Sequence, residues 1–314
     1  MKWPCSLIVV LALAVGCDKG TSGDDEGQGG RRSAATRPTS RKIEKVREPA
    51  VAGQFYPGKK AELTKMIDGF LAQVKGEPIG KLRALICPHA GYIYSGPTAA
   101  YAYKQLVGRD IQTVIILAPS HTAYFQGASV PDADAYRTPL GLVEISLLAD
   151  ELAKGKPFVR APKVRIRGGR EGTPHTYEHS LEVQLPFLQK VLKDFRLVPV
   201  VFGQVDPQAV AGKLADRLDD KTLLIASSDL SHYKPYDEAI GIDRKCIDAI
   251  RRLDTKGIDR EQACGRGPIL TLMHLAKKKG WKVQLLDYRN SGDTAGDKSG
   301  VVGYAAIAFF GGDQ

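Results

Sequence analysis

The chain has 314 residues, of which 43% are hydrophobic, 25% charged and 7% aromatic. This length fits one large domain or two small ones, and the composition excludes a disordered protein, a collagen-like repeat, a disulfide-stapled miniprotein and a multi-pass membrane protein. Lys and Arg number 45 against 35 Asp and Glu, and the formal net charge of +10 raises the question of nucleic-acid binding.

The first 17 residues have the pattern of an export signal. Lys2 precedes an apolar run over residues 7–15, which is too short for the roughly 20 residues of a spanning helix but suits the core of a secretory signal. The run ends in Ala14-Val15-Gly16-Cys17, which resembles a bacterial lipobox. We therefore predict a lipoprotein-type signal peptide over residues 1–17, lipidated at Cys17. A plain signal peptide cut at another small residue and a buried N-terminal strand are the alternatives.

Residues 18–47 are rich in Gly, Ser, Thr and Arg and poor in apolar residues, so we predict a flexible charged tether. Seven Lys and Arg against one Glu occupy residues 31–47, and no aromatic residue lies among them. This pattern favours contact with anionic lipid headgroups over nucleic-acid binding. The sequence thus predicts an exported bacterial lipoprotein, anchored at the periplasmic face through Cys17 and the basic tether. If the signal interpretation fails, the protein is cytoplasmic.

Residues 48–314 alternate between apolar, β-branched runs and amphipathic stretches of helical length. The predicted strands are 82–88, 112–119, 197–202, 222–228, 282–287 and 301–310, and the predicted helices are 60–74, 97–106, 180–192, 207–218, 237–253 and 269–279. This alternation predicts an α/β domain with a largely parallel central sheet flanked by helices. Glycine-rich phosphate-binding loops do not follow the strands, so we predict no nucleotide cofactor.

Polar residues with metal-binding chemistry follow three of these strands. His89 follows the first strand, His121 the second, and Asp229 and His232 the fourth. The carboxyl ends of parallel strands share one edge of the sheet, where ligands bind. Cys264 lies beside the start of the last helix, where a thiolate is favoured. Two imidazoles with a carboxylate suit non-heme iron, and with a thiolate they suit zinc, copper or iron.

Six segments carry a resemblance to a known family. They are Arg47-Glu-Pro-Ala-Val-Ala-Gly-Gln-Phe-Tyr-Pro57, Pro88-His-Ala-Gly-Tyr-Ile-Tyr-Ser-Gly96, Pro119-Ser-His121, Glu178-His-Ser-Leu-Glu-Val-Gln-Leu-Pro186, Ser227-Ser-Asp-Leu-Ser-His-Tyr233 and Cys264-Gly-Arg-Gly-Pro268. Together, and in this order, they resemble the MEMO family, whose bacterial members are called AmmeMemoRadiSam system protein B. That family is similar in fold to the class III extradiol dioxygenases.

The resemblance implies one transition-metal ion held by His89, His121 and Cys264, with His232 and Asp229 beside it as catalytic groups. Iron(II) or copper is the metal it implies first, and zinc is the alternative. A Cys stands where the dioxygenases have a Glu, and this softer ligand departs from the ring-cleaving pattern. The implied activity is iron- or copper-dependent redox chemistry of a dioxygenase-like kind, on an unknown small molecule or peptide in the metal cleft.

Five further residues are predicted around this cleft. Tyr92 is expected to line it or to pack at the strand exit, Ser120 to line it or to cap the next helix, and Arg266 to hold an anionic substrate group or to cap carbonyls. Glu178 and His179 are expected to support the ligands from behind, to form the pocket wall, or to begin a solvated helix.

Two other functions stay open. The same fold can serve as a non-catalytic protein that binds a metal, a ligand or a peptide. The segment His175-Thr-Tyr-Glu-His179 also fits the H-x-x-E-H pattern of inverted zinc peptidases, in which two His bind zinc and the Glu is the base.

Overall fold

The computed structural model describes residues 42–258 and 263–311. The predicted signal peptide, Cys17 and most of the predicted tether lie outside these ranges. Within them, no helix combines the length and the apolar character that crossing a membrane requires.

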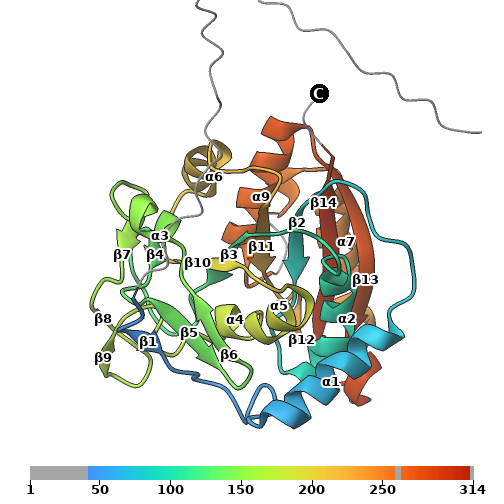
Figure 1. The fold of residues 1–314 in the computed structure, drawn as a ribbon. Helices are drawn as coiled ribbons and strands as arrows, with labels where there is room; N and C mark the ends of the chain where they lie inside the picture. The colour runs from blue at the N-terminus through green and yellow to red at the C-terminus, as the bar shows by residue number, and fades with distance from the viewer. Residues whose placement is uncertain (1–41, 259–262, 312–314) are drawn as a thin grey trace, which may run out of the picture. The chain divides into compact units, whose positions relative to one another are not determined.

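Four parallel strands form the centre of the main sheet, in the order β2 (Leu82–Cys87), β11 (Thr222–Ser227), β3 (Thr113–Pro119) and β10 (Arg196–Phe202). Nearly every side chain in them is buried, as expected of strands covered on both faces. The register pairs Ser227 with Cys87 and Phe202 with Pro119, so the four strands end along one edge (Figure 1). The predicted α/β fold is confirmed.

Antiparallel strands extend the sheet on both sides. They are β14 (Val301–Phe310), β13 (Lys282–Asn290) and β12 (His232–Lys234) beside β2, and β4 (Ala128–Val130) beside β10, with β7 (Phe158–Arg160) parallel to β4. The sheet is thus parallel at its centre, which carries the candidate site, and mostly antiparallel outside it.

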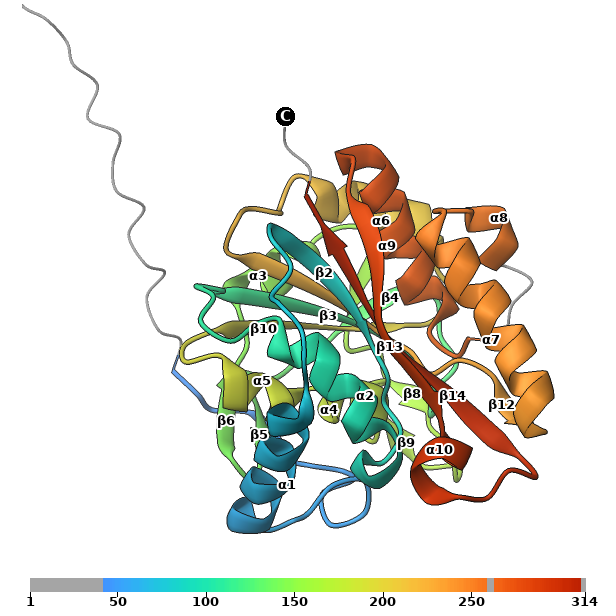
Figure 2. The same ribbon diagram turned by 90° about the vertical axis from the view of Figure 1, so that its right-hand side faces the viewer.

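Helices cover the sheet on both sides. On one side lie α9 (Arg266–Lys279) and α6 (Pro207–Ala215), and on the other α1 (Lys60–Gln73) and α2 (Tyr92–Lys104) (Figure 2). The remaining helices are α3 (Leu147–Leu152), α4 (His179–Glu182), α5 (Leu185–Val191), α7 (Tyr236–Arg251), α8 (Thr255–Ile258) and α10 (Ser291–Ala295).

Two helices differ from their predictions. The helix predicted at 97–106 begins five residues earlier, at Tyr92, and contains Pro97 in its interior. The helix predicted at 180–192 is divided into α4 and α5, because Pro186 occupies the first turn of α5, where its missing N–H is tolerated. The break places a short helix, α4, beside the end of β3.

A second, smaller sheet anchors the start of the folded body. In it β1 (Val46–Arg47) pairs with β5 (Ala135–Thr138), which pairs with β6 (Gly141–Glu144); a hairpin of β8 (Val164–Arg165) and β9 (Glu171–Gly172) stands apart. The backbone N–H groups of Glu44 and Lys45 donate to the Asp134 carboxylate at 2.9 and 2.8 Å. The folded body therefore begins before residue 48, because the last residues of the predicted tether pair with β5.

Candidate metal centre

His89 lies two residues beyond β2, with a ring that is only 2% exposed. Its Nδ1 is 2.8 Å from Ser227 Oγ, and that hydroxyl donates its only hydrogen to the Ser180 carbonyl at 2.6 Å. The Gln184 amide donates to the same oxygen at 2.8 Å. Nδ1 of His89 must therefore be the donor in its bond to Ser227, which leaves a lone pair on Nε2.

His121 is fixed in the same tautomer by a carboxylate. Its Nδ1 is 2.8 Å from Glu178 Oε1, and its backbone N–H donates to Oε2 at 2.6 Å. Burial alone would raise the pKa of Glu178, but the hydrogen bonds and charge of His121, with the charge of His179, lower it to about 2. An ionised carboxylate only accepts, so Nδ1 donates, and in the neutral ring Nε2 carries the lone pair. Metal-ligating histidines commonly have such a partner.

The structure brings His179 to the same place. Candidate ligand atoms of His89, His121 and His179 all lie within 4.8 Å of one another. Nitrogens bound to one ion at about 2.0–2.1 Å lie at most about 4.2 Å apart, so small side-chain movements suffice to bring them onto one ion. The sequence pattern predicts His179 behind the ligands or in the pocket wall, whereas in the structure it is a member of the cluster.

Cys264 contacts this cluster through His89 and is outside the group of three histidines. Its Sγ is 3.1 Å from His89 Nε2, and the backbone N–H of Asp229 donates to Sγ at 3.2 Å. The approach needs a glycine next in the chain, because a Cβ on Gly265 would overlap the Ser227 carbonyl oxygen. Burial, with the Asp229 charge, raises the pKa of Cys264 above its ordinary value. The thiol is therefore protonated in the metal-free protein, whereas its place before α9 predicted a thiolate.

Asp229 follows β11 and lies against His89. Its Oδ1 accepts from the His89 backbone N–H at 2.7 Å, and its Oδ2 is 3.9 Å from His89 Nε2. Burial raises the pKa of Asp229, while the hydrogen bond from His89 and the neighbouring imidazoles oppose the rise. His232 lies on β12 and is outside the three-histidine group, but it is near enough to act electrostatically on both His89 and Asp229.

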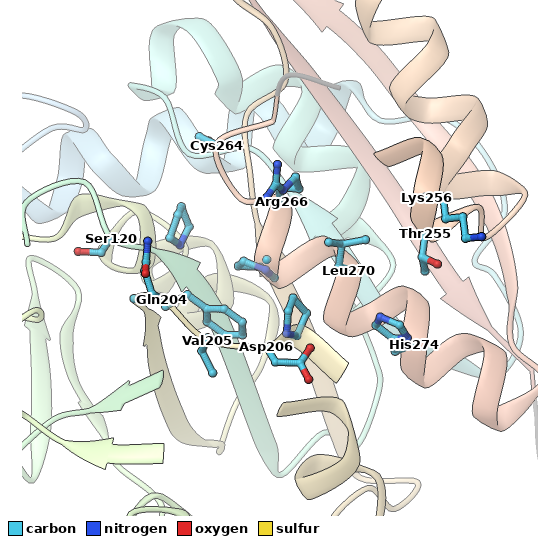
Figure 3. A pocket seen from close by; sticks show the side chains of 16 residues that line it. Ser120, Gln204, Val205, Asp206, Thr255, Lys256, Cys264, Arg266, Leu270 and His274 are labelled. Atoms are coloured by element: carbon cyan, nitrogen blue, oxygen red, sulfur yellow. The ribbon is translucent and has the colours of Figure 1, made fainter. Parts of the chain in front are cut away.

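The other predicted pocket residues fall into two places. Tyr92 is buried and its hydroxyl donates to the Val183 carbonyl at 2.6 Å, which is the position of a packing residue. Ser120 and Arg266 line a cavity of about 670 Å³, bounded by the ends of β3 and β10 and by α6, α8 and α9. Figure 3 shows that Cys264 borders the same cavity, so the cavity adjoins the histidine cluster through this thiol.

The rival zinc-peptidase pattern does not form a site. His175 Nε2 donates to the Ser129 carbonyl at 3.0 Å, so its Nδ1 accepts from the Tyr136 hydroxyl at 2.7 Å. Both nitrogens are engaged, and the Glu of the pattern, Glu178, is bonded to His121 instead. Burial lowers the pKa of His175 to about 3, so the ring is neutral and structural.

Known proteins are similar to most of this chain. A family model described as Memo-like protein matches residues 47–308. A MEMO1 family protein of Methanopyrus kandleri is 42% identical over 289 residues, covering 84% of this chain and 98% of its own length. MEMO1 family proteins of Sulfolobus acidocaldarius and Methanosarcina barkeri are 40% and 39% identical, covering 84% and 83% of this chain and 99% of their own lengths.

Proposed function

The chain belongs to the Memo-like protein family, and we propose that it binds one transition-metal ion through His89, His121 and Cys264, with His179 as a further donor. The observation that carries the proposal is the matched pair of tautomers. Ser227 and Glu178 each hold an Nδ1–H, so both Nε2 atoms face away from these partners, and His89 Nε2 lies against Cys264, which is itself a proposed ligand.

The donor set suits iron, copper or zinc. Imidazole nitrogens and a thiol sulfur are borderline or soft ligands, whereas magnesium and calcium require oxygen ligands. We propose iron or copper, with zinc as the alternative. When bound, iron or copper would supply one-electron redox chemistry toward a small molecule in the cleft.

The protein's own groups would handle protons and position the reactant. The Cys264 thiol must lose its proton when it binds a metal, and the charge of Asp229, whose backbone N–H already donates to Sγ, acts on this thiol. We propose that Asp229 and His232 exchange protons with the cleft. The adjoining cavity of about 670 Å³ has the size of a small-molecule site, which supports a small molecule over a peptide.

Metal analysis tests this proposal. The full chain, purified anaerobically, is expected to contain close to one equivalent of iron or copper, and His89→Ala and Cys264→Ala to lack it. His175→Gln, which alters a buried histidine outside the cluster, should retain the metal. Zinc that survives both substitutions would contradict the ligand assignment. Oxygen consumption by the loaded protein would support redox activity, and tight binding without it would favour a non-catalytic metal-binding protein.

We also propose that the protein is an exported lipoprotein anchored through Cys17. The apolar run over residues 7–15 and the cysteine directly after it support this, and both precede the family match, which starts at residue 47. Metabolic labelling with a radioactive fatty acid in a bacterial host is expected to label the wild-type chain but not Cys17→Ser. Equal labelling of both chains, or of neither, would contradict the anchor.

A further inference from the structure

A buried ion pair lies behind the metal centre, between the start of the folded body and α4. Arg47, on β1, pairs with Glu182, at the end of α4, and their side chains are 7% and 0% exposed. The two residues are separated by 135 positions in the chain.

The Arg47 guanidinium forms hydrogen bonds with the segment that leads into α4. Its Nε donates to the His175 carbonyl at 3.0 Å and its Nη2 to the Glu178 carbonyl at 2.9 Å, while Nη1 contacts Glu182. The guanidinium also lies over the Tyr136 ring, 5.2 Å from its centroid. A planar fork can hold these three acceptors at once, which a lysine ammonium on a flexible stem does less well.

The Glu182 carboxylate fixes the other side of the contact. Besides Arg47 it accepts from the backbone N–H groups of Ala50 and Val51, at 2.7 and 3.1 Å, and from the Tyr56 hydroxyl at 2.5 Å. The pair is therefore fully hydrogen-bonded, and it ties residues 47–56 to α4.

We infer that Arg47 and Glu182 are positioning residues for the metal centre. They fix residues 175–182, and through this segment they keep the Glu178 carboxylate on His121 and hold His179 beside the cluster. Buried ion pairs add little stability compared with apolar packing. Arg47 binds the carbonyls of His175 and Glu178, in the segment that carries the Glu178 and His179 side chains. Its contacts are therefore suited to orienting these two side chains. The effect on a bound metal rests on the proposed function, whereas the effect on His121 does not.

The first test uses the metal-free full chain and reads the His121 ring directly. Nitrogen-15 NMR of the imidazole is expected to show a single Nδ1–H tautomer in the wild type and a mixture, or the Nε2–H form, in Arg47→Met. The matched control is Arg83→Met. Arg83 is also buried, and it pairs with Asp220 and donates to the Gly311 carbonyl, away from residues 175–182. This control should leave the His121 tautomer unchanged.

The second test adds cobalt(II), whose visible spectrum reports the geometry of its ligands. Arg47→Met is expected to bind cobalt roughly 10–100-fold more weakly than the wild type, as for other losses of outer-shell support, with a shifted spectrum. Arg83→Met should show the wild-type affinity and spectrum. Arg47→Lys keeps the charge but not the fork, and we expect a smaller loss. If Arg47→Met does not fold, Arg47→Lys decides.

The inference is overturned if the Arg47 variants that fold keep both the wild-type tautomer and the wild-type cobalt affinity. It is equally overturned if Arg83→Met disturbs the centre as much, because the effect would then be one of general stability. A wild-type protein that binds no metal, yet whose His121 tautomer depends on Arg47, would refute the proposed function and leave the positioning role supported.

Discussion

Two histidines that are equally buried have different roles in the molecule. His89, at the edge of the central sheet, and His175, beside β4 and β5, are each 2% exposed. Burial lowers the pKa of both rings, so both are neutral. Both rings have a partner at each nitrogen, but both partners of His175 are oxygen atoms, whereas Nε2 of His89 bonds the Cys264 sulfur, which can itself bind a metal. The state of the second nitrogen, rather than burial, separates a candidate ligand from a structural histidine.

The largest difference in metal affinity is expected between variants of His89, the proposed ligand, and His175, the structural histidine. His89→Ala is expected to lower metal affinity by more than about 100-fold, since it deletes a proposed ligand and opens a buried space. His175→Gln should lose stability but keep the wild-type metal stoichiometry. Elemental analysis and a competition titration with a chelator measure both. Loss of the metal in His175→Gln but not in His89→Ala would show that His175, and not His89, binds the metal.

The next effect concerns the carboxylate that orients His121. Glu178→Gln is expected to weaken metal binding roughly 10–100-fold, because a neutral amide no longer matches the two N–H donors of His121. The matched control is Glu171→Gln, which makes the same change on an exposed residue of β9. Wild-type affinity in Glu178→Gln would show that His121 needs no such partner.

The stability of the protein in acid tests whether His175 is neutral in the folded state. Its pKa is about 3 in the folded protein against an ordinary 6.5. The unfolded chain therefore binds a proton that the folded chain refuses, and stability is lost as the pH falls from 6.5 toward 3. At pH 5 the loss from this group alone is about 2 kcal/mol.

Urea unfolding of the metal-free protein at pH 7.5 and pH 5 measures this loss. His175→Gln lacks the group, so its free energy of unfolding should fall less between the two pH values than that of the wild type. Equal falls in the two proteins would contradict the assignment of a neutral, structural His175.

The smallest effect is expected at the hydroxyl that orients His89. Ser227→Ala removes the acceptor of Nδ1–H and leaves the Gln184 donor with one partner fewer, so we expect a stability loss of about 1–3 kcal/mol and a few-fold weaker metal binding. Thr98→Val removes another buried hydroxyl, one that bonds Asp287 away from the cluster. It should lose stability alone. Identical metal affinities in the two variants would remove Ser227 from the account.

The main fold was accessible from the sequence because its strands are long, apolar and regular. The six predicted strands correspond to β2, β3, β10, β11, β13 and β14, with ends that differ by a few residues at most. The strands between residues 128 and 172 were not predicted. They are two to four residues long, which is too short to show a period. Some of them pair with distant strands, as β4 does with β10 and β1 with β5, whereas β5–β6 and β8–β9 are local hairpins too short to recognise.

The candidate site could be predicted from the sequence only in part, because some of its contacts join residues far apart in the chain. His89 and His121 are recognisable because each directly follows a strand. The bond between His121 and Glu178 joins residues 57 positions apart, and that between His89 and Ser227 joins residues 138 apart. A local sequence pattern cannot predict hydrogen bonds between residues so far apart. His175 matched a zinc motif in the sequence, and the hydroxyl and carbonyl that bond its two nitrogens exclude it as a ligand.

The most direct test of the metal centre is the position of the metal itself. We would grow crystals of the full chain loaded with iron or copper and collect anomalous diffraction at the absorption edge of that metal. A single peak is expected at about 2.0–2.3 Å from His89 Nε2, His121 Nε2 and Cys264 Sγ. A peak at His175, or none at the ends of β2 and β3, would contradict the account.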